Sequence, residues 1–146
     1  MILIDIGNTN IVFAVSVNKK IKNIKRISTN KEIKSLNNIV SKIIKNYLNL
    51  NCLKNSKTAI ISSVVPNINS HIIKILKLHK IKVYVLKPKD MLPYFKIDYD
   101  LNEIGADRIA NSAAVIDYKI QNSIVIDFGT ATTFEVLKKN RFLGGL

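Results

Sequence analysis

Two segments of the chain repeat one pattern, at residues 2–15 and residues 124–137, which lie 122 positions apart. Each copy begins with a run of branched apolar residues that delivers one Asp, Asp5 in the first copy and Asp127 in the second. An apolar residue and a Gly follow, then residues rich in Asn and Thr, then another apolar run. Because branched runs favour strands and Gly favours a tight turn, each copy predicts a β-hairpin. We therefore expect two hairpins that grip phosphates and face each other across a cleft.

The glycine of each copy, Gly7 or Gly129, permits a positive φ and the close approach of a ligand. Hydroxyl and amide side chains beside it can face phosphate oxygens. The buried strand fixes its Asp at the strand end, where the carboxylate can hold a metal ion or orient a nucleophile. A single Asp-x-Gly turn is common in ordinary hairpins, so this interpretation depends on the repetition.

The composition predicts a globular protein without a membrane span. Of its 146 residues, 47% are hydrophobic, which is enough for one compact domain with a core. No run of eighteen or more apolar residues occurs, and the N-terminus lacks a basic leader before an apolar segment. The single cysteine, Cys52, cannot form an internal disulfide and has no neighbouring His pattern, so we interpret it as incidental. These features predict a cytoplasmic protein.

The net charge of +13 raises the question of nucleic-acid binding. The charge is uneven, because residues 1–89 hold 17 Lys and Arg against two acids, whereas residues 90–146 hold six against eight. The lysines are spread through expected loops and exposed helix faces and are not clustered with aromatic residues. We therefore predict a solvated basic surface, with nucleic acid as the less favoured partner.

Apolar periodicity and turn residues divide the rest of the chain into strands and helices. A helix capped by Thr29 or Asn30 carries a core-facing stripe from Ile33 to Leu48. The other expected elements are, in chain order, strand 21–28, strand 58–65 ended by Pro66, helix 67–79, strand 83–86, an irregular segment 87–104, a helix opened by Gly105, a hairpin from Ser123, and a turn at 138–141 that leads into Gly144-Gly145. This order predicts an α/β fold with a mixed sheet flanked by helices.

Four motifs occur in a fixed order along the chain, and a glycine pair follows them. They are DIGNTN (5–10), SSVVP (62–66), GADR (105–108) and DFGTATT (127–133), with the pair at 144–145. Together they resemble the type III pantothenate kinases, members of the acetate-and-sugar-kinase and actin superfamily. The resemblance covers the whole chain and implies an actin-like (ribonuclease H-like) ATPase fold, with an N-terminal domain at 1–104. Residues 105–146 would be the GADR helix and the start of a second, C-terminally truncated domain, since two equal copies would reach about residue 244.

The resemblance implies roles for individual residues. ATP would contact the first phosphate loop and one threonine of the second, namely Asp5, Ile6, Gly7, Asn8, Thr9, Asn10, Ile11, Val12 and Thr130. The pantothenate pocket would include Tyr99, Gly105, Ala106, Asp107 and Arg108. Asp107 would be catalytic, since an Asp at a helix start can accept the hydroxyl proton during phosphoryl transfer. Asp127 would bind a monovalent cation, K⁺ or NH₄⁺, and Mg²⁺ would accompany ATP.

Each of these residues also has an ordinary structural interpretation. Asp5 could cap a turn, and Asp107 could simply favour the positive end of a helix dipole. Arg108 could pair bidentately with a carboxylate or phosphate, or form a surface salt bridge to Glu103. Tyr99 departs from the family pattern, because the loop between it and GADR is one residue shorter in this chain. The motifs taken together favour the functional interpretation.

The resemblance further implies that the intact protein transfers the γ-phosphoryl group of ATP to pantothenate, the first step of coenzyme A synthesis. It implies a homodimer, and we expect little activity from the chain as given because half of the cleft is absent. One alternative is a non-catalytic accessory factor for transcription that binds nucleic acid through the basic N-terminal part. Its retention of Asp5, Asp107 and Asp127 argues against that role. The other is a sugar or acetate kinase, which the GADR motif disfavours.

Overall fold

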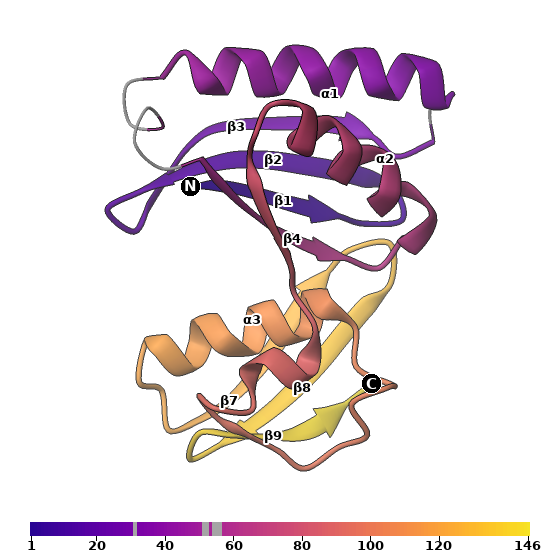
Figure 1. The fold of residues 1–146 in the computed structure, drawn as a ribbon. Coiled ribbons are helices and arrows are strands. Elements are labelled where there is room, and N and C mark those ends of the chain that lie inside the picture. Colours follow the sequence, from indigo (N-terminus) through magenta and orange to yellow (C-terminus); the bar gives the residue numbers. More distant parts are fainter. Residues whose placement is uncertain (31, 51–52, 54–56) are drawn as a thin grey trace. The chain divides into compact units, whose positions relative to one another are not determined.

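The computed structural model describes residues 1–30, 32–50, 53 and 57–146, so the interpretation of Cys52 lies outside the described residues. The chain divides into a first unit, Met1–Val85, and a second unit, Leu86–Leu146 (Figure 1). The domain boundary expected near residue 104 concerns the two duplicated domains and stays a prediction. In the described part, no helix combines the length and the apolar character that crossing a membrane requires.

The first unit is a five-stranded sheet with two helices. Its elements are β1 (Ile2–Ile6), β2 (Asn10–Val17), β3 (Lys20–Ser28), α1 (Ile33–Leu48), β4 (Thr58–Ser63), α2 (Pro66–Leu78) and β5 (Lys82–Val85). The strand order is β3-β2-β1-β4-β5, with β1 antiparallel to β2 and parallel to β4. The mixed pairing and the first predicted hairpin are therefore confirmed.

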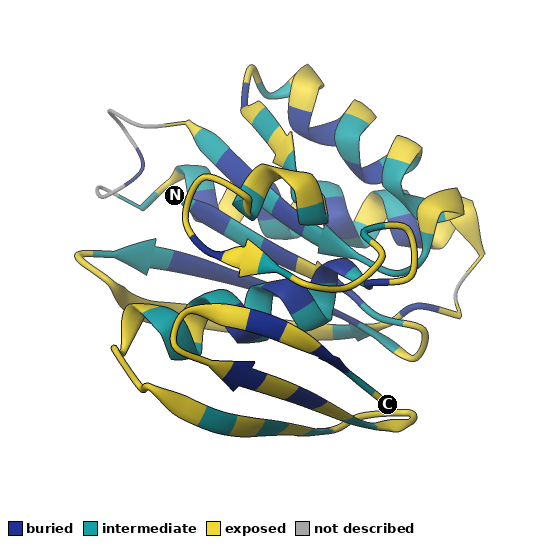
Figure 2. Ribbon diagram, turned by 90° about the horizontal axis from the view of Figure 1, so that it is seen from below, coloured by how far each residue is buried: buried dark blue, intermediate teal, exposed yellow. Residues whose placement is uncertain are grey.

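One face of this sheet forms the core of the first unit. Side chains alternate along a strand, so Ile2, Ile4 and Ile6 of β1 point to one side, together with their partners on β2. We call this side of a hairpin its isoleucine face, and the opposite side, which carries Asp5, its aspartate face. Helices α1 and α2 bury their apolar stripes against the isoleucine face (Figure 2). Full burial of each such side chain contributes about 1.5–3 kcal/mol.

The predicted cap of α1 is wrong. The helix begins at Ile33 with Glu32 in the N-cap position, and neither Thr29 nor Asn30 holds its end. Thr29 instead donates a hydrogen bond from its hydroxyl to the carbonyl oxygen of Gly7, at 2.7 Å. A tertiary contact with the first hairpin thus replaces the local capping bond.

The second unit is a four-stranded sheet covered on one side by a helix. Its elements are a 3₁₀ turn η2 (Pro88–Met91), β6 (Lys96–Ile97), α3 (Ala106–Asp117), β7 (Asn122–Phe128), β8 (Thr132–Lys138) and β9 (Arg141–Gly145). The order is β6-β9-β8-β7, with β8 antiparallel to both neighbours and β6 parallel to β9. The second predicted hairpin and the helix after Gly105 are confirmed. The glycine pair at 144–145 lies inside β9.

The two hairpins differ by one residue at the turn. In the first, Ile6 pairs with Ile11 across the turn, whereas in the second Phe128 pairs with Thr132. The constant offset of 122 read from the sequence therefore holds for β1 and β7 but becomes 121 for β2 and β8. Because side chains alternate along a strand, this one-residue change decides which residues of β8 face α3.

Candidate functional site

The turn of the first hairpin is closed by backbone hydrogen bonds. The amide of Gly7 donates to the carbonyl of Asn10 at 2.9 Å, and the amide of Thr29 donates to the carbonyl of Thr9 at 2.9 Å. With the Thr29 hydroxyl on the Gly7 carbonyl, the turn is tied to the end of β3. The expected positive φ at Gly7 and Gly129 is not found, since Gly144 is the positive-φ glycine of the described chain. Gly7 matters for space instead, because a Cβ there would lie 3.3 Å from the Asn10 oxygen.

The predicted phosphate-loop residues point in two directions. Asp5, Asn8 and Thr9 are exposed at the surface of the first unit. Ile6 and Ile11 are fully buried in the core. Only the backbone of these two isoleucines could therefore contact a nucleotide. Gly7, Asn10 and Val12 are half-buried.

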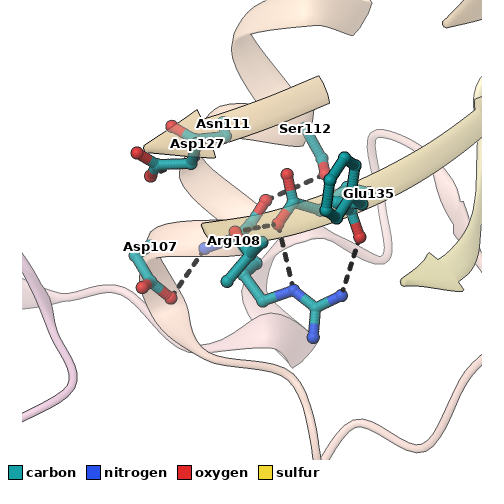
Figure 3. Close-up of polar contacts among 8 residues, drawn as sticks. Asp107, Arg108, Asn111, Ser112, Asp127 and Glu135 are labelled. Atoms are coloured by element: carbon teal, nitrogen blue, oxygen red, sulfur yellow. Dashed lines mark hydrogen bonds and ion pairs between the residues drawn. The ribbon is translucent and has the colours of Figure 1, made fainter. Parts of the chain in front are cut away.

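The turn of the second hairpin carries Asp127 at the end of β7. Its half-buried carboxylate accepts a hydrogen bond through Oδ2 from Nδ2 of Asn111 on α3, at 3.1 Å (Figure 3). Thr130, the expected ATP contact, is exposed in the turn. Carboxylate and amide oxygens suit a hard monovalent cation, so the donor set around Asp127 fits the predicted K⁺ or NH₄⁺. Among the described residues, no three or more His, Cys, Asp or Glu gather into a metal cluster.

Asp107 lies in the first turn of α3, directly after the N-cap Gly105 and Ala106. Its Oδ1 accepts a hydrogen bond from the backbone amide of Arg108 at 2.8 Å, and the side chain is half-buried. The N-terminal end of a helix favours a negatively charged side chain in its first turn, which is where Asp107 lies. The position therefore suits both a general base and a structural dipole partner.

Arg108 pairs with Glu135 and not with Glu103, so the alternative interpretation as a surface salt bridge is not the one that the structure shows. Its Nε donates to Oε1 of Glu135 on β8 at 3.1 Å, and its Nη2 donates to the carbonyl of Phe134 at 3.3 Å (Figure 3). The Glu135 side chain is fully buried and the Arg108 side chain is 15% exposed. The ion pair is thus internal to the second unit, between the aspartate face of its hairpin and α3.

Tyr99 reaches the same region from the loop before α3. Its ring stands edge-on to Phe142 with the centroids 6.3 Å apart, and the Arg108 guanidinium lies 6.0 Å from the Phe142 ring centre. The glycine pair of β9 makes room for both neighbours. A Cβ on Gly144 would lie 2.9 Å from the Tyr99 ring, and one on Gly145 would lie 2.2 Å from Arg108 Nη2.

The second unit therefore gathers most of the predicted substrate and cation residues. Asp107, Arg108, Asp127 and Tyr99 all lie around the start of α3 and the strands beneath it. The residues at 5–12 belong to the first unit, so the cleft shared by both hairpins stays a prediction.

Three residues with roles in these arrangements were missed from the sequence: Thr29, Asn111 and Glu135. Asn111 lies one helical turn after Asp107, a spacing that places both on one side of α3. Glu135 is an acid within an alternating apolar strand, and such a position signals a buried charge that needs a partner. Thr29 gave no signal beyond a preference for caps and turns.

The chain was compared with known proteins. A family profile described as "Type III pantothenate kinase" matches residues 1–146. A type III pantothenate kinase from Pelagibacter ubique is 41% identical over 145 residues, and one from Thermosipho africanus is 37% identical over 153 residues. These alignments include 97% and 100% of this chain but 56% and 57% of the relatives, so the chain spans little more than half their length.

Two solved structures resemble the fold. The ethanolamine utilization protein EutJ from Carboxydothermus hydrogenoformans gives a TM-score of 0.60 at 15% identity, covering 99% of this chain and 50% of that one. A Campylobacter jejuni protein assigned to the Baf family of transcriptional activators gives 0.53 at 24% identity, covering 100% of this chain and 53% of that one. At such identities the likeness shows the fold alone, and the α/β fold is that of the actin-like ATPases.

Proposed function

The chain belongs to the type III pantothenate kinase family, and from that premise we propose that the protein phosphorylates pantothenate with ATP. The product would be 4'-phosphopantothenate, the first intermediate of coenzyme A synthesis. The observation that carries this proposal is the start of α3. There the Asp107 carboxylate accepts from the backbone amide of Arg108, and the Arg108 guanidinium is paired with the buried Glu135.

Each group supplies a part that phosphoryl transfer needs. Asp107 would accept the proton of the attacking hydroxyl, while Arg108 would bind the carboxylate of pantothenate. The turn at 7–10 would hold nucleotide phosphates through backbone amides and the exposed Asn8 and Thr9. Mg²⁺ bound with ATP would neutralise phosphate charge, and a monovalent cation would be held by the Asp127 carboxylate.

The remaining family properties are part of the same proposal. The complete protein would act in the cytoplasm as a homodimer. The chain of 146 residues would turn over slowly or not at all, because it spans 56% of the Pelagibacter relative. Typical kinases reach about 1–100 turnovers per second.

A chimera tests the function directly. Residues 1–146 would be joined to the part of the Pelagibacter ubique relative that follows its aligned region, and formation of phosphopantothenate from ATP would be measured. We expect the chimera to be active, and Asp107→Asn to lower kcat by about 10²–10⁴-fold, since a general base contributes that much. Asp98→Asn, which changes an exposed acid of the same unit, is the control. A folded chimera without pantothenate-dependent ATP turnover, beside an active parent relative, would contradict the proposal.

A second candidate is a non-catalytic nucleic-acid-binding role. It is motivated by the basic charge of residues 1–89 and by the name of the Campylobacter protein. Binding of duplex DNA by the 146-residue chain at micromolar concentration, weakening steeply with salt, would support it. We expect no such binding, because the lysines are spread along the sequence of the first unit, and Lys82 over Tyr84 is the one lysine–aromatic contact found among the described residues.

A further inference from the structure

Glu135 is the one acidic residue among the fully buried side chains of the described chain. Its Oε1 accepts two hydrogen bonds, from Arg108 Nε at 3.1 Å and from the Thr133 hydroxyl at 2.9 Å. Its Oε2 is also buried and has no hydrogen-bond partner among the described residues. A buried carboxylate is costly unless a positive group compensates it, so Arg108 and Glu135 hold each other in place.

The guanidinium of Arg108 is enclosed on two of its three nitrogens. Nε faces Glu135, and Nη2 faces both the Phe134 carbonyl and the space left by Gly145. Phe142 lies under the group, with its ring centre 6.0 Å from Cζ. Nη1 is the nitrogen directed away from these contacts, as Figure 3 shows.

An arginine that is free in solution loses side-chain entropy when it binds an anion. A guanidinium that is already fixed avoids that loss, and its planar fork then presents donors in one direction only. The buried acid therefore has a consequence beyond neutralising charge, because it sets which edge of Arg108 is offered to a ligand.

We propose that Glu135 is the positioning residue of the substrate site: it fixes Arg108 Nε so that the Nη1 edge is presented to the carboxylate of the acceptor. Thr133 supports this arrangement by orienting the Glu135 carboxylate from the same strand face, two residues away. The identity of the carboxylate ligand rests on the proposed function. The ion pair by which Glu135 fixes Arg108 is independent of that function.

The first measurement is made on the ¹⁵N-labelled 146-residue chain by NMR. The chain contains three arginines, so their three Nε–H signals can be assigned and compared: Arg26, Arg108 and Arg141. Arg26 is exposed, and Arg141 pairs with Asp98 at the surface, so both serve as internal references. We expect the Arg108 Nε proton to exchange with water at least about tenfold more slowly than that of Arg26, because a buried hydrogen bond protects it.

Three variants separate positioning from folding. Glu135→Gln keeps an acceptor oxygen but loses the charge, so it should weaken the protection of Arg108 and leave Arg141 unchanged, and circular dichroism would verify that the variant is folded. Thr133→Val keeps the carboxylate and removes only its supporting hydroxyl, so it should give a smaller loss in the same direction if Glu135→Gln does not fold. Asp98→Asn should change the Arg141 signal alone. Unchanged Arg108 exchange in both folded variants would overturn the proposal.

The second measurement asks whether the fixed arginine selects a carboxylate. Pantothenate and pantothenyl alcohol, which carries a hydroxymethyl group in place of the carboxylate, would be titrated into the chimera described above, because the 146-residue chain spans 56% of the Pelagibacter relative. The shift of the wild-type Arg108 signal should give a dissociation constant for pantothenate at least about tenfold lower than that for the alcohol. Glu135→Gln should bring the ratio of the two dissociation constants close to one. A purely structural role for Glu135 would leave the ratio intact and would overturn the proposal. A protected Arg108 that distinguishes neither ligand would instead refute pantothenate as the acceptor, while the exchange data still support the hold of Glu135.

Discussion

The two hairpins share one sequence pattern but bury opposite faces. On the first hairpin the isoleucine face lies in the core, with Ile2, Ile4 and Ile6 at most 2% exposed. The matching residues of the second hairpin are at least 48% exposed: Ile124, Ile126 and Phe128. Their cross-strand neighbours Phe134 and Val136 are exposed as well. The same pattern therefore predicted two apolar faces, but only one of them is covered within the described chain.

The difference comes from the helices. Helices α1 and α2 cover the isoleucine face of the first hairpin, whereas α3 covers the aspartate face of the second. On the aspartate face of the second hairpin, polar contacts of Asp127 and Glu135 therefore lie beside the apolar packing of Leu137. By strand register, Glu135 occupies the place that Ala14 occupies in the first hairpin. A helix that lies on the aspartate face turns an ordinary strand position into part of a site.

The largest expected effect comes from breaking the ion pair between Arg108 and Glu135. Arg108→Ala would leave the buried Glu135 without its cation and lower the free energy of unfolding by about 3–5 kcal/mol. Arg141→Ala removes an exposed pair with Asp98 in the same unit and should cost less than about 1 kcal/mol.

Urea unfolding followed by circular dichroism would measure both ion-pair variants. If both variants lost the same free energy of unfolding, the burial of Glu135 would have no energetic consequence. The polar contacts of the second hairpin would then not distinguish it energetically from the first.

A matched pair of core truncations tests the apolar half of the comparison. Ile4→Ala removes a fully buried side chain and should lower the free energy of unfolding by about 2–5 kcal/mol, because a cavity remains. Ile126→Ala changes the equivalent residue of the second hairpin, which is exposed, and should stay within about 0.5 kcal/mol. If Ile126→Ala proved as costly as Ile4→Ala in denaturant titrations, a cover for the second isoleucine face would have to exist in solution.

A smaller effect concerns the turn of the first hairpin. Thr29→Val keeps the shape of the side chain but removes the hydroxyl that donates to the Gly7 carbonyl, so about 1 kcal/mol of stability should be lost. Hydrogen exchange of the Gly7 amide, which closes the turn onto Asn10, should accelerate. Thr132→Val, at the exposed turn of the second hairpin, is the control and should change neither quantity. An unaltered Gly7 exchange rate in Thr29→Val would show that the backbone bonds alone fix this turn.

The smallest effect is a pH dependence of the stability that Tyr47 contributes where α1 packs on the first hairpin. The Tyr47 hydroxyl on α1 donates to the carbonyl of Phe13 at 3.1 Å and also lies against the carbonyl of Asn23. Burial raises the pKa of Tyr47 from its ordinary value of 10.0 to about 12. The folded state therefore binds this proton more tightly, and its stabilising contribution is complete below pH 10 and is lost as the pH rises to 12.

Tyr47→Phe removes the titrating group. It should cost about 1 kcal/mol at neutral pH and abolish this part of the alkaline decline, which melting temperatures between pH 9 and 12 would measure. A wild-type protein whose stability between pH 10 and 12 falls no faster than that of Tyr47→Phe would contradict the assignment.

Much of the fold was predictable because local patterns fix it. Alternating and branched apolar runs predicted both hairpins, the stripe of α1 matched its buried face, and Gly105 marked the start of α3. The motifs also predicted that Tyr99, Asp107 and Arg108 belong to one region, and the second unit brings them together. These properties depend on residue spacing within an element, which the sequence carries directly.

Other features depended on which elements meet in space. The sequence offered Glu103 as one salt-bridge partner for Arg108, but the guanidinium pairs with Glu135, which the shorter second turn places on the face of β8 toward α3. The sequence offered Thr29 as a helix cap, but its hydroxyl donates to the Gly7 carbonyl instead. Burial of an apolar face needs a second surface, and a local pattern cannot say where that surface comes from. The sequence by itself therefore determined the hairpins and placed Tyr99, Asp107 and Arg108 in recognisable motifs. The tertiary structure decided their partners and added Thr29, Asn111 and Glu135, because pairing and burial are properties of two surfaces in contact.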